Sequence, residues 1–188
     1  MDFLNAVILL TNFIIVPAIT YGSQLALGAI GVTLIYGVLR FANFAYGDLM
    51  AFGTMVVILM TWYLQSLGIS FGLLPTALLA LPVGILVTIG VSLFFDKTVF
   101  EYYRQKKSNS VTFIVVSLGL MFVLNAVVRI IIGPGDVNFM DGHKFIMKAR
   151  EFKNITGLNE GLAIKSTQVI TLITTIITCS LLFYFLNK

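Results

Sequence analysis

The residues with the most scope for chemistry lie together in one stretch, 36–53, whose sequence is YGVLRFANFAYGDLMAFG. It places an arginine, an asparagine, a tyrosine and an aspartate between two strongly apolar segments. Inside a membrane, polar groups and breaks in a helix are tolerated only where they are buried in protein or line a cavity, and such breaks often mark transport sites. The residues that we therefore expect to line a path are Asn43, Tyr46, Gly47 and Asp48.

A simpler interpretation of the same stretch stays open at this point. Residues 40–48 would then be a loop at the membrane surface, in which Arg40 and Asp48 are solvated or paired. Asp48 would otherwise cap the helix that follows, because an aspartate at a helix start accepts hydrogen bonds from free backbone N–H groups.

The rest of the sequence lacks the residue groups that enzymes and metal sites need. It contains no phosphate-binding loop of the GxxxxGK[ST] type and no cluster of histidines or cysteines. His143 stands alone in a polar connection, where a solvated histidine is expected, and no serine, cysteine and histidine gather into a triad. Asn154 begins a glycosylation sequon, but a pattern of three residues recurs by chance. We predict no catalytic residue, no metal site and no cofactor in this chain.

The composition is that of an integral membrane protein. Of the 188 residues, 59% are hydrophobic and 11% are charged, against about 25% charged in soluble domains. The apolar residues fall in runs long enough to span a bilayer as helices, and they do not alternate as in a β-barrel. The basic residues lie in short connections beside these runs, which argues against a nucleic-acid partner. Cys179 lies inside a run and is the single cysteine, so it forms no internal disulfide.

The expected fold is an all-α polytopic helix bundle with about six transmembrane segments. The first two segments are separated only by Gly22 and Ser23, and Pro17 interrupts the first. Residues 5–39 are therefore either two spans or one broken helix, which would give five spans in total. The expected spans lie near 5–21, 24–39, 47–66, 71–95, 111–132 and 166–187.

Basic residues in the short connections predict the orientation of the chain. The connection 96–107 is read as a compact basic loop with Lys97, Arg104, Lys106 and Lys107, which places it in the cytoplasm. With six spans, the polar connection 133–165 then lies outside.

Small residues along the spans predict where helices pack closely, because helices in lipid associate through close backbone approach and hydroxyl contacts. On the fourth span they recur every four residues, and packing alone explains them as well as hydroxyls that line a path. The residues expected at helix contacts are Gly28, Gly31, Gly37, Ala80, Gly84 and Thr88. Asn125, in the fifth span, either bonds across helices or faces a cavity.

Residues 31–53, GVTLIYGVLRFANFAYGDLMAFG, resemble the N-terminal signature of the branched-chain amino-acid ABC transporter permeases of the LivH type. That motif reads roughly GxTLIYGVxxxxNFAHG[ED]xxxxG. The acidic-then-basic connection 96–104 and the helix 116–125 follow in the order that the family has. Tyr46 stands where the family usually has histidine, so a titratable donor is replaced by a phenol that is neutral near pH 7.

The resemblance implies a permease subunit of an ABC importer for branched-chain amino acids in the bacterial inner membrane. Such a subunit forms half of the translocation path and moves substrate by alternating access. The implied partners are a second permease subunit, two ATP-binding subunits that use ATP, and a periplasmic substrate-binding protein, with no nucleic acid. Alternatives are a related permease for urea or another small solute, or a secondary transporter.

The resemblance also bears on domain organisation. Family members continue past the position of Lys188 into a cytoplasmic helix that docks on the ATPase and then into further spans. Residues 1–188 are therefore expected to form a single transmembrane permease domain that stops before the ATPase-coupling loop. A truncated membrane fragment without transport activity is the corresponding alternative.

Overall fold

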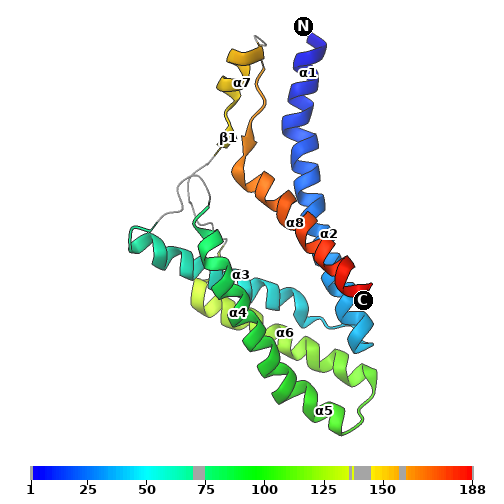
Figure 1. Cartoon of the computed structure of the whole chain (residues 1–188). Helices are drawn as coiled ribbons and strands as arrows, with labels where there is room; N and C mark the ends of the chain where they lie inside the picture. Colours follow the sequence, from blue (N-terminus) through cyan, green and yellow to red (C-terminus); the bar gives the residue numbers. More distant parts are fainter. Residues whose placement is uncertain (1, 70–74, 136, 138–144, 157–159, 188) are drawn as a thin grey trace. The chain divides into compact units, whose positions relative to one another are not determined.

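The computed structural model describes residues 2–69, 75–135, 137, 145–156 and 160–187 (Figure 1). These fall into two compact units, one with the described residues of 1–31 and 141–188, the other with those of 32–72 and 76–140. In the described part of the chain, five helices are long and apolar enough to cross a membrane, which confirms the all-α membrane fold. They are Phe3–Leu39, Ala45–Ser66, Ala77–Gln105, Ser110–Ile132 and Ser166–Leu186.

The first two predicted spans form one continuous helix, which is the second of the two alternatives, so the described residues contain five candidate spans. The helix consists of α1 (Asp2–Leu10), the π-helical turn η1 (Thr11–Ile15) and α2 (Val16–Leu39). The wider π turn lies just before Pro17, where the missing N–H and the proline ring disturb the regular ladder. The Ser23 hydroxyl donates to Thr20 O at 2.7 Å, so this polar side chain is satisfied on its own helix and no turn forms.

This continuity changes one element of the predicted orientation. A count of five spans leaves two predictions unchanged: the connection 96–107 on the cytoplasmic side and the connection 133–165 on the outer side. The same rule then predicts that the N-terminus lies on the outer side, because one crossing fewer precedes Arg40.

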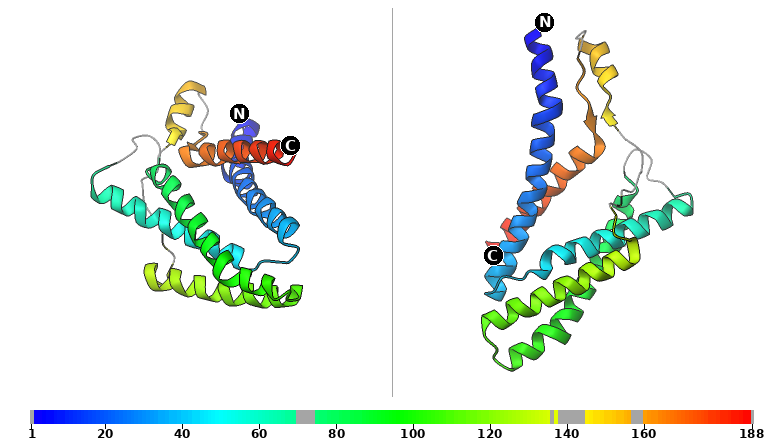
Figure 2. Two further views of the ribbon diagram at one scale, coloured as in Figure 1. Left: turned by 60° about the horizontal axis from the view of Figure 1, so that its bottom comes forward. Right: turned by 180° about the vertical axis from the view of Figure 1, so that it is seen from behind.

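The second unit packs α3 (Ala45–Ser66) against both α4 (Ala77–Phe95) and α6 (Ser110–Ile132), which lie beside it in every view (Figure 2). α6 ends where turn chemistry predicts, because Gly133 has a φ of 101° and donates its N–H to Arg129 O at 2.9 Å. Residues 71–74 of the predicted fourth span lie outside the described residues.

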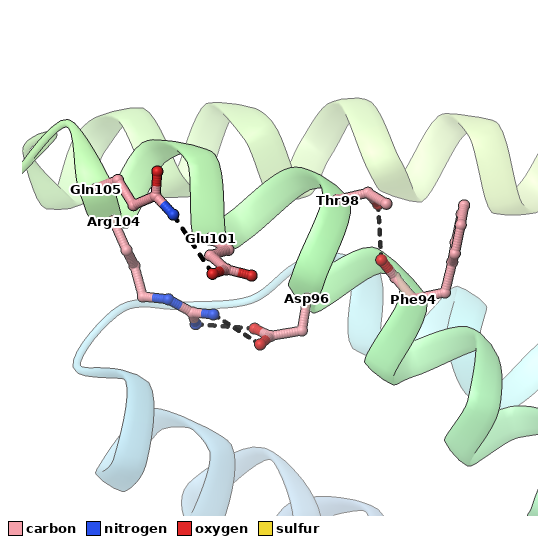
Figure 3. A network of polar contacts seen from close by, with 6 residues as sticks. All are labelled: Phe94, Asp96, Thr98, Glu101, Arg104 and Gln105. Atoms are coloured by element: carbon pink, nitrogen blue, oxygen red, sulfur yellow. Dashed lines mark hydrogen bonds and ion pairs between the residues drawn. The ribbon is translucent and has the colours of Figure 1, made fainter.

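The predicted basic loop 96–107 is helical for most of its length, so that expectation was wrong. The fourth helix continues through the π turn η2 (Asp96–Phe100) into α5 (Glu101–Gln105). This segment contains no glycine or proline, and its charges bond along the helix instead of requiring a loop. Arg104 reaches back to Asp96, while Gln105 Nε2 donates to Glu101 Oε1 at 3.4 Å (Figure 3). The true connection is therefore short, and its hydrogen-bonded turn ends the helix at Gln105.

The first unit adds a small polar motif to the membrane helices. β1 (Phe145–Met147) pairs antiparallel with β2 (Ile164–Lys165), α7 (Ala149–Thr156) lies between them in sequence, and α8 (Ser166–Leu186) follows. The connection 133–165 is thus partly structured rather than a plain loop, and His143 lies outside the described residues.

Asn12 joins this polar motif to the N-terminal helix. Its side-chain amide donates to Gly161 O at 2.7 Å and accepts from the Ala163 N–H at 3.1 Å. The Glu160 N–H donates to Asn5 Oδ1 at 3.4 Å, one to two turns earlier on the same helix. Gly161 also lies close to the start of α7, because a Cβ there would collide with the backbone carbonyl of Ala149. Two asparagines of one helix therefore form hydrogen bonds with backbone groups of residues 160, 161 and 163.

Replacing Asn12 with leucine is expected to loosen this motif. The change removes two hydrogen bonds to buried or half-buried backbone groups, at a cost of about 2 kcal/mol in the free energy of unfolding. Limited proteolysis of the protein in detergent should show faster cleavage between residues 157 and 165. Thr11→Val is the matched control, because the Thr11 hydroxyl bonds only its own helix, at Val7 O. Equal protection of the two variants would contradict the role given to Asn12.

Candidate functional site

The polar stretch begins where α2 ends, at a residue in the left-handed region. Arg40 has a φ of 60°, a conformation that costs a non-glycine residue about 1–2 kcal/mol, and its N–H donates to Tyr36 O at 2.9 Å. Asn43 Oδ1 then accepts from the Ala45 N–H at 3.1 Å, a local turn that starts α3. Phe44 is the N-cap of α3, so Asp48 does not cap this helix.

Phe41 anchors the connection in the core of the second unit. Its ring is 7% exposed, stacks on Phe113 with centroids 5.1 Å apart, and lies 5.8 Å from the ring of Phe100. The Phe44 N–H donates to Ser117 Oγ at 3.2 Å, and the Ser117 hydroxyl donates to Ile114 O at 2.8 Å. α6 thus fixes the connection through a ring and a buried hydroxyl, neither of which was singled out from the sequence.

Asp48 and Asn125 meet across α3 and α6. Asn125 Nδ2 donates to Asp48 Oδ1 at 2.9 Å, although the two residues are 77 positions apart in the chain. Both side chains are half-buried, so the amide bonds across helices, which was one of the two alternatives for Asn125. A hydrogen bond to a carboxylate is worth about 1.5–3 kcal/mol in such surroundings.

A cavity of about 380 Å³ lies in the same unit, beside the start of α3. Asn43 and Tyr46 line it, together with Ser92 and Asp96 from the fourth helix, while the rest of the wall is aliphatic or aromatic. Of the four residues expected to line a path, the structure therefore places two at the cavity. The other two do not line it: Asp48 bonds Asn125, and Gly47 is exposed, with open space where a Cβ would be.

Asp96 reaches the cavity with its charge already paired. Arg104 Nη1 and Nη2 donate to its two oxygens at 2.8 and 2.6 Å, a bidentate pair drawn in Figure 3. Both side chains are nearly half exposed, so water screens the pair and its contribution to stability is below about 1 kcal/mol. The pair holds the carboxylate in place at the cavity wall.

Some of the residues expected at helix contacts lie at such a contact and others do not. Ala80 is fully buried, and Gly84 and Thr88 lie against Gly53 and Val57 of α3. A Cβ added at Gly28 or Gly37 meets nothing within 4 Å, and Gly31 is half-buried. The close helix contact thus lies between α3 and α4, while Gly28 and Gly37 of α2 have no neighbouring atom close to the position of a Cβ.

The site is suited to binding rather than to bond chemistry. In the described ranges, no three histidine, cysteine, aspartate or glutamate side chains gather as metal ligands. The cavity combines an apolar wall with the amide of Asn43 and the phenol of Tyr46, which is typical of a pocket that orients a small, largely apolar molecule.

Comparison with known proteins bears on nearly the whole chain. Residues 14–188 match the family model described as "Branched-chain amino acid transport system / permease component". No curated protein and no solved structure matches the chain. The matched range contains the α2–α3 connection, the Asp48–Asn125 pair and every residue that lines the cavity.

Proposed function

Because the chain belongs to the family of branched-chain amino acid transport permease components, we propose that it is the permease subunit of an ABC importer for branched-chain amino acids. The family match confirms the resemblance carried by residues 31–53. The chain is a multi-pass membrane protein and a permease component rather than an enzyme. Permeases of this family carry no cofactor, since ATP is hydrolysed by separate subunits.

The partners follow from the same membership. An ABC permease works with ATPase subunits and with permease partners. We further propose a complex with a second permease subunit, two ATP-binding subunits and a periplasmic substrate-binding protein, located in a bacterial inner membrane. Each permease subunit would then form half of the path and change its access from one side to the other as ATP is used.

The cavity at the α2–α3 connection supports a place for the solute within this path. Its apolar wall suits an aliphatic side chain, and Asn43 and Tyr46 offer polar groups that can orient the rest of the molecule. Asp48 contributes to the path indirectly, because its hydrogen bond from Asn125 holds the first turn of α3 against α6. Gly47 keeps that turn free of a side chain next to Tyr46.

Filling the cavity tests the proposal. Ser92 lines the cavity from α4, so Ser92→Phe is expected to lower ATP-driven leucine uptake about tenfold, as when a substrate site loses about 1.4 kcal/mol of affinity. The assay uses proteoliposomes that hold the transporter assembled from this chain and its partner subunits. Leu86→Phe is the matched control, because Leu86 lies on the same helix and is 70% exposed.

Three outcomes separate the alternatives. Normal uptake by Ser92→Phe would remove the cavity from the path. Uptake of urea without uptake of leucine would favour a different solute. A transporter that moves leucine in an ion gradient without ATP would contradict the ABC mechanism.

A further inference from the structure

A second cavity lies within the unit formed by the described residues of 1–31 and 141–188. Its volume is about 480 Å³, within the range of about 300–1,000 Å³ that is usual for ligand pockets. The N-terminal helix forms one wall with Leu9, Phe13 and Pro17, and β1 and α7 add Phe145 and Ala149. One side of the cavity is thus apolar.

Three charged side chains complete the lining. Lys153 comes from α7, Glu160 from the segment that follows, and Lys165 from β2. The ion pair found among the described residues is Arg104–Asp96, so none of these three side chains is paired there with an opposite charge. Within the described part of the chain, the two lysines and the glutamate at this cavity therefore have no ion pair of their own.

The neutral polar side chains that line the cavity already form hydrogen bonds with the backbone. The amide of Asn12 bonds Gly161 and Ala163, and Gln168 Oε1 accepts from the Lys165 N–H at 3.0 Å. These bonds hold residues 160–165 in place and so position Glu160 and Lys165 at the rim. The cavity thus has a hydrogen-bonded backbone at one side and, among the described residues, charged side chains without ion pairs.

We propose that this cavity binds a small zwitterion with an apolar substituent, an α-amino acid such as leucine. The carboxylate would bond Lys153 and Lys165, the ammonium would bond Glu160, and the side chain would lie on Phe13, Phe145 and their apolar neighbours. A plain anion would leave Glu160 beside a like charge, and a plain cation would meet two lysines. A zwitterion offers each of the three side chains an opposite charge, with its one carboxylate shared by the two lysines.

The inference rests on the proposed function for the choice of leucine, and it adds a second place where the solute is held. The placing of the basic connection 96–107 in the cytoplasm predicts that residues 145–156 and 160–165 lie on the outer side of the membrane. A site there would take the amino acid before it enters the path.

The test measures equilibrium binding of radiolabelled L-leucine to the assembled transporter in nanodiscs without ATP. The Ser92→Phe background is used, so that the cavity at the α2–α3 connection is filled. Unlabelled competitors are 4-methylpentanoate, which lacks the ammonium, and 3-methylbutylamine, which lacks the carboxylate. The background protein should prefer leucine to both competitors by about tenfold or more, since each lacks one charge-assisted contact.

Two variants should change this preference in opposite ways. Glu160→Gln is expected to weaken leucine about tenfold while 4-methylpentanoate binds as well as before or better. Lys153→Gln is expected to weaken leucine and 4-methylpentanoate and to spare 3-methylbutylamine. Arg150→Gln is the matched control on α7, because Arg150 is exposed and does not line the cavity, and it should change nothing.

The outcomes distinguish this site from the proposed function. If both cavity variants bind leucine like the background protein, the site is overturned, and ATP-driven leucine uptake by the wild type would leave the proposed function intact. Equal weakening of all three ligands also overturns it, because that pattern reports lost structure rather than lost charge recognition. A wild-type transporter that takes up no branched-chain amino acid overturns the proposed function instead.

Discussion

Replacing Gly84 with valine is expected to make the protein about 2–3 kcal/mol less stable, because it overpacks the closest helix contact in the second unit. A Cβ at Gly84 would collide with the side chain of Val57 and lie 3.4 Å from Gly53 O. On the facing helix, a Cβ at Gly53 would lie 2.6 Å from Thr88 Oγ1. Two glycines on neighbouring helices therefore let α3 and α4 approach each other closely. Unfolding in mixed detergent micelles, followed by circular dichroism, measures the loss.

Gly90→Val is the matched control for this prediction. Gly90 lies on the same helix, and a Cβ there meets nothing within 4 Å, so the change in helix propensity is the same without the collision. Val57→Ala should restore part of the stability lost by Gly84→Val, since it removes the side-chain atoms of Val57 that collide. Equal stability of Gly84→Val and Gly90→Val would contradict the close contact between α3 and α4.

Replacing Asn125 with aspartate is expected to cost about 2–3 kcal/mol in stability and to abolish uptake. The change removes the donor that Asp48 Oδ1 contacts at 2.9 Å and puts a second carboxylate in its place. Two like charges at this distance repel, and half-burial limits screening by water. The first turn of α3, which carries Tyr46 at the cavity, would then move away from α6.

A charge swap tests whether the pair itself matters. The double variant Asp48→Asn with Asn125→Asp keeps one carboxylate and one amide, so it should recover most of the stability lost by Asn125→Asp alone. Asp96→Asn at the exposed pair with Arg104 is the comparison and should cost less than about 1 kcal/mol. A double variant no more stable than Asn125→Asp would show that the two side chains act separately.

The spans could be predicted because a bilayer imposes a minimum length on apolar helices. Three of them begin within two residues of the expected position, at Ala45, Ser110 and Ser166. The sequence left one helix or two open for residues 5–39, since the proline, glycine and serine near residues 17–23 are also the residues of turns. The side chains of Thr20 and Ser23 bond the helix itself, at Val16 O and Thr20 O. Such bonds become visible only once the backbone is known.

Part of the lining of the cavity at the α2–α3 connection was named from the sequence. Asn43 and Tyr46 were named and lie at the cavity. Helix geometry alone separates Tyr46 from Asp48 by about 200° around the axis, so the two cannot face the same space. The partner of Asp48 could not be predicted, because a single sequence does not show which helix places an asparagine against α3. The same holds for Ser117, a small polar residue with no motif around it.

The apolar helix from Phe3 to Leu39 is longer than the thickness of the hydrocarbon layer that it would cross. Its 37 residues extend about 55 Å, whereas the hydrocarbon layer is about 30 Å thick. Even a tilt of about 40°, the upper end of the observed range, accommodates only about 26 residues. Some ten residues of this helix must therefore lie outside the hydrocarbon layer, although both ends are apolar, with Phe3 near one and Val38 near the other. We expect protein contacts, from this chain or from a neighbouring subunit, to cover the end that leaves the lipid.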